Sequence, residues 1–113
     1  MITIDDFAKV ELKVGTVLEA EEVVESEKLI KLKVDLGPLP EGAGSDIRQI
    51  LAGVKQWYKP EEFVGKQVII VANLEPRMML GLESQGMMLA ASGDDGPVFL
   101  TTPKQVPNGT KIR

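Results

Sequence analysis

The chain has 113 residues, a length in the usual range for one domain, and we expect residues 1–113 to form a single domain. Its 43% hydrophobic and 27% charged residues are typical of a globular protein, and the absence of His and Cys excludes disulfides, His or Cys metal ligands and nucleophiles activated by His. Its 13 Lys and Arg against 17 Asp and Glu give a net charge of −4, which argues against a uniformly basic surface.

Hydropathy and the placement of charge add two expectations. There is no run of about 18 apolar residues and no basic start followed by an apolar stretch, so we expect no membrane span, no secretory signal and a cytoplasmic location. The acids concentrate in residues 19–27 and at Asp94 and Asp95, and we expect Lys31, Lys33, Arg48 and Arg77 to lie apart from them. A local basic face therefore remains open despite the net charge.

The N-terminal residues predict a helical turn followed by a strand. Residues 4–7 place two acids between apolar residues, where they favour the amino end of a helical turn. We expect this turn to cover the barrel that the strands of the rest of the chain predict. Residues 10–14 alternate between apolar and polar, which is the period of a half-buried strand. Gly15 then indicates a bulge or a tight bend.

The strand signal in residues 30–36 is the most regular in the chain. Its apolar side chains should face inward and Lys31 and Lys33 outward, because alternate residues of a strand share a face. Residues 37–46 contain two prolines and three glycines, which predicts a flexible loop before a third strand at residues 47–52.

The second half of the chain adds one short helix and more strands. Residues 60–62 begin with Pro followed by two acids, a pattern typical of a helix start. Residues 67–72 form a continuous β-branched apolar run, which favours a strand buried on both faces. With further apolar runs at residues 87–91 and 98–100, the pattern predicts an all-β fold of the small closed five-stranded barrel type that binds nucleic acids or sugars.

Residues 73–91 carry the sequence NLEPRMMLGLESQGMMLAA, which resembles the tRNA-binding domain family. This family occurs as the carboxy-terminal appendage of methionyl-tRNA synthetases and as stand-alone dimeric proteins. The resemblance extends over nearly the whole chain through the segments IDDFAKVELKVGTVLEAE, KLIKLKVDLG, RQILAG and YKPEEFVGKQVIIVANL. It implies an oligonucleotide-binding barrel with short helices and extra C-terminal strands, a homodimer, tRNA as partner, assistance to a methionyl-tRNA synthetase in cis or in trans, and neither catalysis nor a cofactor.

Two features depart from the family pattern. Family members often carry a basic residue after the Pro-Arg pair, whereas Met78 and Met79 follow Arg77 in this chain. The loop at residues 37–46 is also longer than the compact turn of the stand-alone proteins. The first departure implies one cationic contact fewer, and the second an altered edge of the binding face.

Four basic residues are candidates for phosphate contacts. Lys31 and Lys33 are two residues apart in one strand, about 7 Å, which suits neighbouring phosphates, although they also fit an ordinary solvated face. Arg48 and Arg77 could bind phosphate through both arms of the guanidinium group or stack on a base. The alternative for each arginine is a surface ion pair with a glutamate.

Four further residues are candidates for contacts with bases and riboses. Asn73, Ser84 and Gln85 offer donors and acceptors for base edges, ribose hydroxyls or phosphate, but such residues also satisfy backbone groups in turns. Met87 should face outward, where its thioether could pack against a base. The predicted tRNA-binding set, with no metal ligand in it, is thus Lys31, Lys33, Arg48, Asn73, Arg77, Ser84, Gln85 and Met87.

Other assignments stay open beside this one. Trp57 could stack on a base or be structural, whereas Tyr58 precedes the short helix and should be a structural lid. The leading function is a tRNA-binding module. A protein-interaction or dimerisation appendage, or a CsaA-type chaperone barrel that holds peptide on the same face, is the second, supported by the acidic charge and Met78. An enzyme using Asp and Glu pairs is the least supported, because the acids cluster in predicted exposed turns.

Overall fold

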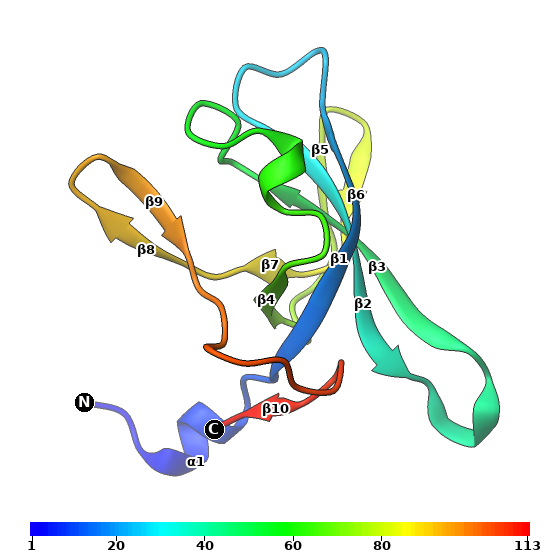
Figure 1. Ribbon diagram of the computed structural model, residues 1–113. Coiled ribbons are helices and arrows are strands. Elements are labelled where there is room, and N and C mark those ends of the chain that lie inside the picture. Colours follow the sequence, from blue (N-terminus) through cyan, green and yellow to red (C-terminus); the bar gives the residue numbers. More distant parts are fainter.

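The computed structural model describes residues 1–113, and strands dominate it (Figure 1). The main sheet has the strand order β3 (Ser45–Ala52), β2 (Ile30–Pro38), β1 (Leu12–Glu22), β4 (Gln67–Val71) and β7 (Met87–Met88), with β10 (Lys111–Ile112) added beside β1, and it curls strongly upon itself. All pairings in this sheet are antiparallel. The mainly-β barrel prediction is confirmed. None of the helices is long and apolar enough to span a membrane.

Strand β1 (Leu12–Glu22) gives the sheet its curl because it pairs with two different strands along its length. Its first half pairs with β4 (Gln67–Val71) and its second half with β2 (Ile30–Pro38), and both ladders include Thr16. The bulge or bend predicted at Gly15 is not found there, because Gly15 pairs regularly with Val68; the glycine instead permits close packing, since a Cβ there would collide with Val34. The register shift itself comes later, between Val17 and Glu19.

Strands β2 and β3 (Ser45–Ala52) form a long hairpin. Ile30, Leu32 and Val34 are fully buried, as predicted from the alternation. The predicted flexible loop is shorter than expected, because the ladder continues to the pair Pro38 and Ser45. The short 3₁₀ turn η1 (Pro40–Gly42) lies at the tip.

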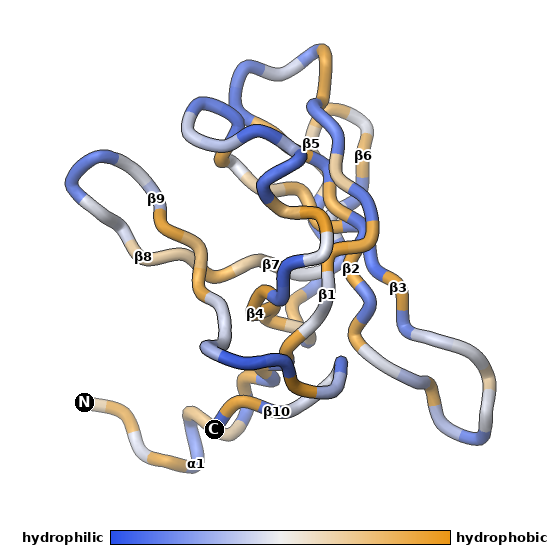
Figure 2. The backbone as a smooth tube through the Cα atoms, viewed as in Figure 1, coloured by the Kyte–Doolittle hydropathy of each residue, from blue (hydrophilic) through white to orange (hydrophobic).

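Strand β4 is buried on both faces, as its continuous apolar run predicts. Val68 and Ile70 point into the main core inside the curled sheet. Ile69 and Val71 point the other way, into a second cluster with Leu12 and Val14 that is covered by residues of the C-terminal segment. The tube coloured by hydropathy shows β4 as an apolar segment (Figure 2).

The C-terminal segment is pinned to the barrel through the buried side chain of Gln67. Its amide nitrogen donates to the carbonyl of Val106 at 2.7 Å, and its amide oxygen accepts from the backbone nitrogen of the same residue at 3.0 Å. Beyond this contact the chain ends in β10 (Lys111–Ile112), which pairs with the start of β1. The second core cluster is thereby closed off from solvent.

The N-terminal helix α1 (Ile4–Ala8) begins at a capping box between Thr3 and Asp6, with the acids at its amino end as predicted. The expectation that it covers the barrel is wrong, because none of its residues is buried and it lies to the side of the sheet (Figure 1). The backbone nitrogen of Val10 donates to the carbonyl of Phe7, so the helical turn extends to Val10 and strand β1 starts only at Leu12.

The remaining elements are short. The 3₁₀ turn η2 (Pro60–Glu62) precedes β4, and β5 (Arg77–Met79) pairs with β6 (Leu82–Ser84) in a small hairpin. After β7 (Met87–Met88), strands β8 (Ala90–Gly93) and β9 (Gly96–Phe99) form a hairpin that projects from the barrel (Figure 1).

An aromatic cluster anchors the base of this projecting hairpin. The ring of Tyr58 lies 5.2 Å from Phe63 and 5.4 Å from Phe99, measured between centroids. These rings pack on the main core, which confirms the prediction of a structural role for Tyr58. Trp57 lies against Gly96, where no Cβ could be accommodated.

Candidate nucleic-acid interface

An apolar groove opens where three parts of the barrel meet: the start of β2, the end of β3 and the connection from β4 to β7. Its volume is about 620 Å³. We call it the methionine groove, and it is lined by Leu29, Leu51, Gly53, Leu74, Glu75, Arg77, Met79, Ser84, Gly86 and Met87.

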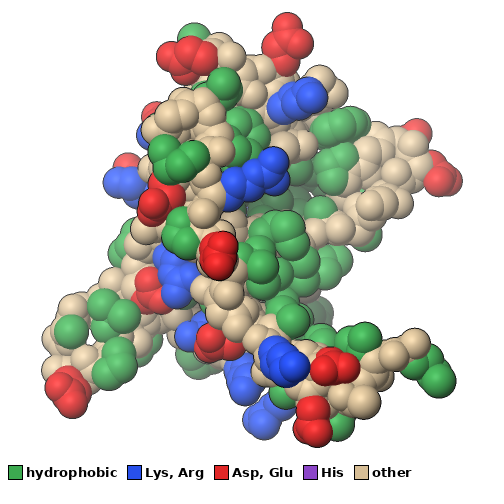
Figure 3. Space-filling view, turned by 180° about the vertical axis from the view of Figure 1, so that it is seen from behind, with side chains coloured by type: hydrophobic (Ala, Val, Ile, Leu, Met, Phe, Trp, Pro, Cys, Tyr) green, Lys and Arg blue, Asp and Glu red, His purple; other side chains and the backbone are tan.

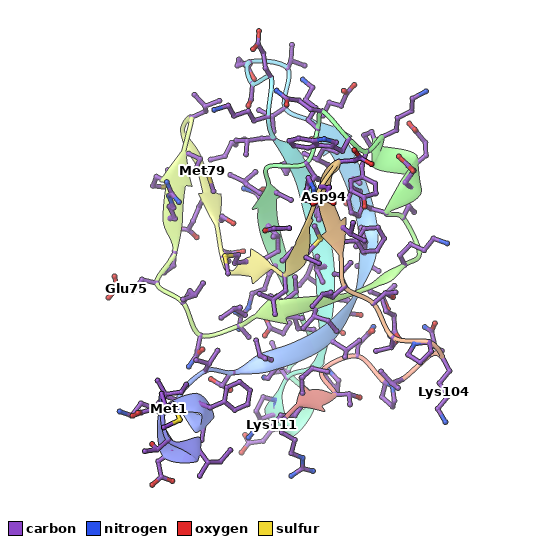
Figure 4. The ribbon with its side chains drawn as sticks, turned by 90° about the vertical axis from the view of Figure 1, so that its left-hand side faces the viewer. Met1, Glu75, Met79, Asp94, Lys104 and Lys111 are labelled. Carbon is purple, nitrogen blue, oxygen red and sulfur yellow. The ribbon has the colours of Figure 1, made fainter.

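The apolar lining of the methionine groove comes from short strands and from the loops beside them. Met87 is 48% exposed whereas Met88 is buried, so the prediction that one methionine faces outward and the other inward is confirmed. Met79 stands at the end of the β5 segment near the hairpin turn, while Glu75 extends into solvent from the loop before β5 (Figure 4). An exposed apolar surface of this kind is a feature of binding sites.

Arg77 is the one basic residue of the groove and its charge is free. It lies in β5 opposite Ser84, is exposed, and forms neither an ion pair nor a side-chain hydrogen bond within the chain. Its guanidinium group is therefore available to an anionic ligand beside the apolar wall.

Arg48 differs from Arg77 because all of its polar atoms are used inside the protein. Its Nε and Nη2 atoms each lie 3.1 Å from the carboxylate of Asp46. Its Nη1 atom donates to the carbonyl of Ala72 and, at 3.3 Å, to that of Gln85. The alternative of an ion pair with an acid is what the structure shows, with Asp46 in place of a glutamate, and Arg48 ties β3 to the end of β4.

Ser84 and Gln85 close the barrel against β3. The buried Ser84 hydroxyl accepts from the backbone nitrogen of Leu51 at 3.0 Å and donates to the carbonyl of Gly86 at 2.9 Å. The side-chain oxygen of Gln85 accepts from the nitrogen of Gln49 at 3.0 Å, and the backbone nitrogen of Gln85 donates to the Gln49 carbonyl at 2.8 Å. These side chains supply partners for β3 groups that no neighbouring strand reaches.

Asn73 is likewise engaged with the backbone. Its side-chain oxygen accepts from the nitrogen of Glu11 at 2.9 Å, and its side-chain nitrogen donates to the carbonyl of Lys9 at 2.6 Å. The amide thus fastens the segment between α1 and β1 to the end of β4. For Asn73, Ser84 and Gln85, the alternative of satisfying backbone groups is what the structure shows, and their contact with RNA stays a prediction.

Lys31 and Lys33 project outward from β2 as predicted, but each faces a glutamate on β1. The Nζ atom of Lys31 lies 2.6 Å from Glu21 and that of Lys33 lies 3.4 Å from Glu19. The hydrogen bond and the positive charge of Lys31 lower the pKa of the exposed Glu21 below its usual value of 4.5. The expectation that these lysines lie apart from the acidic cluster is wrong, because the antiparallel register sets the two pairs directly opposite each other.

The predicted site residues therefore lie on separate parts of the surface. Arg77, Ser84 and Met87 meet at the methionine groove, and Gln85 follows directly in the chain. Lys31 and Lys33 line a separate, charged depression with Glu19 and Glu21. No group of three or more Asp or Glu is arranged to hold a metal ion.

Sequence reasoning missed several apolar residues of the groove. Leu51 is the clearest example, because Ile50 before it faces the core and the alternation of β3 puts Leu51 on the outer face. An apolar residue at a position where polar side chains are expected is the signal that could have identified it. Leu29, Leu74 and Met79 lie outside long strands, and no periodicity marks them.

Comparison with known proteins assigns the chain to a family. Residues 12–111 match the family described as "Putative tRNA binding domain". The chain belongs to this family. This tRNA-binding domain is 49% identical over 111 residues to the methionine–tRNA ligase of Caldanaerobacter subterraneus, an alignment that covers 98% of the chain but 16% of the ligase. The chain thus spans about one sixth of the length of the curated relatives that it matches.

Solved structures agree with this assignment and with the barrel fold. A MetRS related protein from Pyrococcus horikoshii superposes on the tRNA-binding domain with a TM-score of 0.89 at 38% identity, covering 100% of this chain and 98% of that one. The chaperone CsaA from Bacillus anthracis superposes with a TM-score of 0.83 at 30% identity, covering 100% and 99%. The predicted family is therefore confirmed.

Proposed function

We propose that this domain binds tRNA through the methionine groove and Arg77, and that it thereby prolongs the residence of tRNA on a methionyl-tRNA synthetase, either as a part of that enzyme or as its partner. The observation that carries the proposal is the similarity of nearly the whole chain to a methionine–tRNA ligase, with residues 12–111 matching the tRNA-binding family. The domain contributes affinity and leaves the chemistry to the synthetase. This partnership implies a cytoplasmic location.

The charge distribution supports the choice of face. Arg48, Lys31 and Lys33 each have an acidic partner, so their positive charge is partly compensated. Arg77 has none and lines the groove. Because the net charge is −4, we expect modest affinity that weakens steeply with salt.

The test is tRNA affinity measured by gel shift or fluorescence anisotropy at several salt concentrations. Arg77→Ala should weaken binding to all tRNAs and flatten the slope of log affinity against log salt by about one unit. Arg113→Ala is the matched control, since it removes the same charge from an exposed residue after β10, and it should change neither value. Equal losses for both variants, or none for Arg77→Ala, would contradict the placement of the site.

A second candidate function is the holding of unfolded peptide in the same groove. It is favoured by the similarity to the chaperone CsaA together with the apolar groove lining. Competition separates the two: if unfolded peptide is the ligand, it should bind without tRNA and displace any tRNA present. Binding of tRNA that excess peptide leaves unchanged would reject this candidate.

We further propose that the domain forms a homodimer through the N-terminal helix. Helix α1 has no buried residue, yet Ile2, Ile4 and Phe7 are exposed apolar residues. A helix of five residues has little stability of its own, and a second copy related by a two-fold axis would cover these side chains. Light scattering should then give a mass near twice the 12.3 kDa of one chain.

A charged substitution tests this interface. Ile4→Glu should produce a monomer, while Val24→Glu, in the exposed turn between β1 and β2, should leave the dimer intact. A mass of one chain for the unmodified protein at micromolar concentration would reject the homodimer without affecting the proposal for tRNA.

A further inference from the structure

The methionine groove differs in chemistry from two other depressions of the surface. The depression beside β2 is lined by two ion pairs, and the one formed by residues 65–67 and 101–105 has no apolar residue. The methionine groove instead combines leucine and methionine side chains with one free arginine, and its one acid, Glu75, extends into solvent. In the view from behind, hydrophobic side chains gather in the hollowed middle of the molecule, while many of the Asp and Glu stand on projecting tips (Figure 3).

Such a groove is a poor match for the outside of an RNA double helix. A helix presents phosphates and ribose hydroxyls, and it stacks its apolar base faces away from a protein surface. Contact along a helix would also need several cations beside the groove, whereas Arg77 is the only basic residue that lines it. An apolar wall beside a single guanidinium group matches one flat apolar ring that carries one phosphate.

We propose that the methionine groove binds an unpaired, unstacked nucleobase, whose adjoining phosphate contacts Arg77. This inference rests on the proposed tRNA-binding function and names the part of the RNA that the site takes. The volume of about 620 Å³ lies within the roughly 300–1,000 Å³ of pockets that bind small organic ligands, so it admits a nucleoside but not a helix.

Methionines take the place of an aromatic stacking platform in this groove. Tyr58, Phe63 and Phe99 are joined in the cluster at the base of the β8–β9 hairpin, and Trp57 lies against Gly96. None of these rings lines the groove. A thioether side chain is flexible and polarizable and makes favourable contacts with aromatic rings, so it can hold the face of any base.

The first experiment compares RNA ligands that differ only in the presence of free bases. Fluorescence anisotropy should show tighter binding of an unstructured single-stranded oligoribonucleotide than of an RNA duplex of the same length. Binding of the single strand should also be tighter than binding of an abasic oligomer of equal length, which has the same phosphates without bases. Equal affinity for the three ligands would overturn the inference.

The second experiment observes the methionines directly. With methyl-labelled methionine, NMR should show upfield shifts of the Met79 and Met87 methyl signals when the single strand binds, because each lies over a base ring. The methyl signal of Met1, outside the groove, should not move. If tRNA binds while the Met79 and Met87 signals stay in place, the base pocket is refuted, while tRNA binding by the domain stands. If no RNA binds, the proposed function itself fails.

Two variants separate packing from charge. Met79→Ala with Met87→Ala should weaken binding of the single strand on the order of tenfold without changing the salt slope, as loss of stacking does elsewhere. Gly53→Leu places a side chain where a Cβ meets open space, so it should obstruct the groove while the fold and Arg77 are retained. Normal affinity of both variants, or stronger methyl shifts with an unfolded peptide than with RNA, would overturn the inference.

Discussion

Replacing Ser84 by Ala distinguishes a structural from an RNA-binding role for the most buried of the predicted site residues. The Ser84 hydroxyl is the acceptor for the backbone nitrogen of Leu51 and a donor to the carbonyl of Gly86. Ala leaves the buried Leu51 nitrogen without a partner, at a cost of about 1–3 kcal/mol in the free energy of unfolding. For 113 residues, an unfolding entropy of roughly 2.1 cal/mol/K per residue converts this into a fall in Tm of about 4–13 °C.

The assay is thermal or urea unfolding followed by tRNA titration at a temperature where the variant remains folded. Affinity per folded molecule should be unchanged, because the hydroxyl is directed to the backbone and not to solvent. Ser92→Ala, at an exposed position of β8 whose hydroxyl forms no hydrogen bond within the chain, should alter stability by less than about 0.5 kcal/mol. A Ser84→Ala protein of full stability that had lost affinity for tRNA would contradict the structural role of the hydroxyl.

Three further predictions concern other parts of the fold. Lys31→Ala should raise the pKa of Glu21 toward its usual value, as measured by NMR titration of the carboxyl group, and an unchanged pKa would contradict the ion pair. Because the pKa of Glu21 is depressed in the folded state, the stabilisation by this pair should be present at neutral pH and lost as the pH falls through that pKa. Gly96→Ala should displace the indole of Trp57, the one tryptophan of the chain, and so change its fluorescence emission, whereas an unaltered spectrum would contradict the packing. Gln67→Ala should release the C-terminal segment, seen as faster amide exchange at Ile112 before global unfolding, and uniform protection would argue against this anchoring role.

Local patterns predicted the strands and their buried faces well. Alternation identified Ile30, Leu32 and Val34 as core residues, and the continuous run in β4 indicated a strand buried on both faces. Both inferences depend on the two-residue period of side chains in a strand, which is a property of the chain itself. The motif in residues 73–91 likewise identifies the family from the sequence alone.

The composition of the candidate site depended on which backbones meet. The lysines of β2 are neutralised because the antiparallel register sets Glu21 opposite Lys31, an arrangement that sequence distance does not reveal. Ser84 and Arg48 form hydrogen bonds that close the barrel, and these bonds join them to backbone groups that are distant in the sequence. Which polar groups are free to bind is therefore decided by long-range pairing.

The sequence by itself determined the mainly-β class, the inward face of each long strand and the family of this protein, because these follow from local periodicity and from a motif. The tertiary structure decided that Arg77 is free while Arg48 is bound, and that Leu51 and Met87 line one groove. A groove and a free charge are relations between segments distant in the chain, and they arise only when the curled sheet brings these segments together.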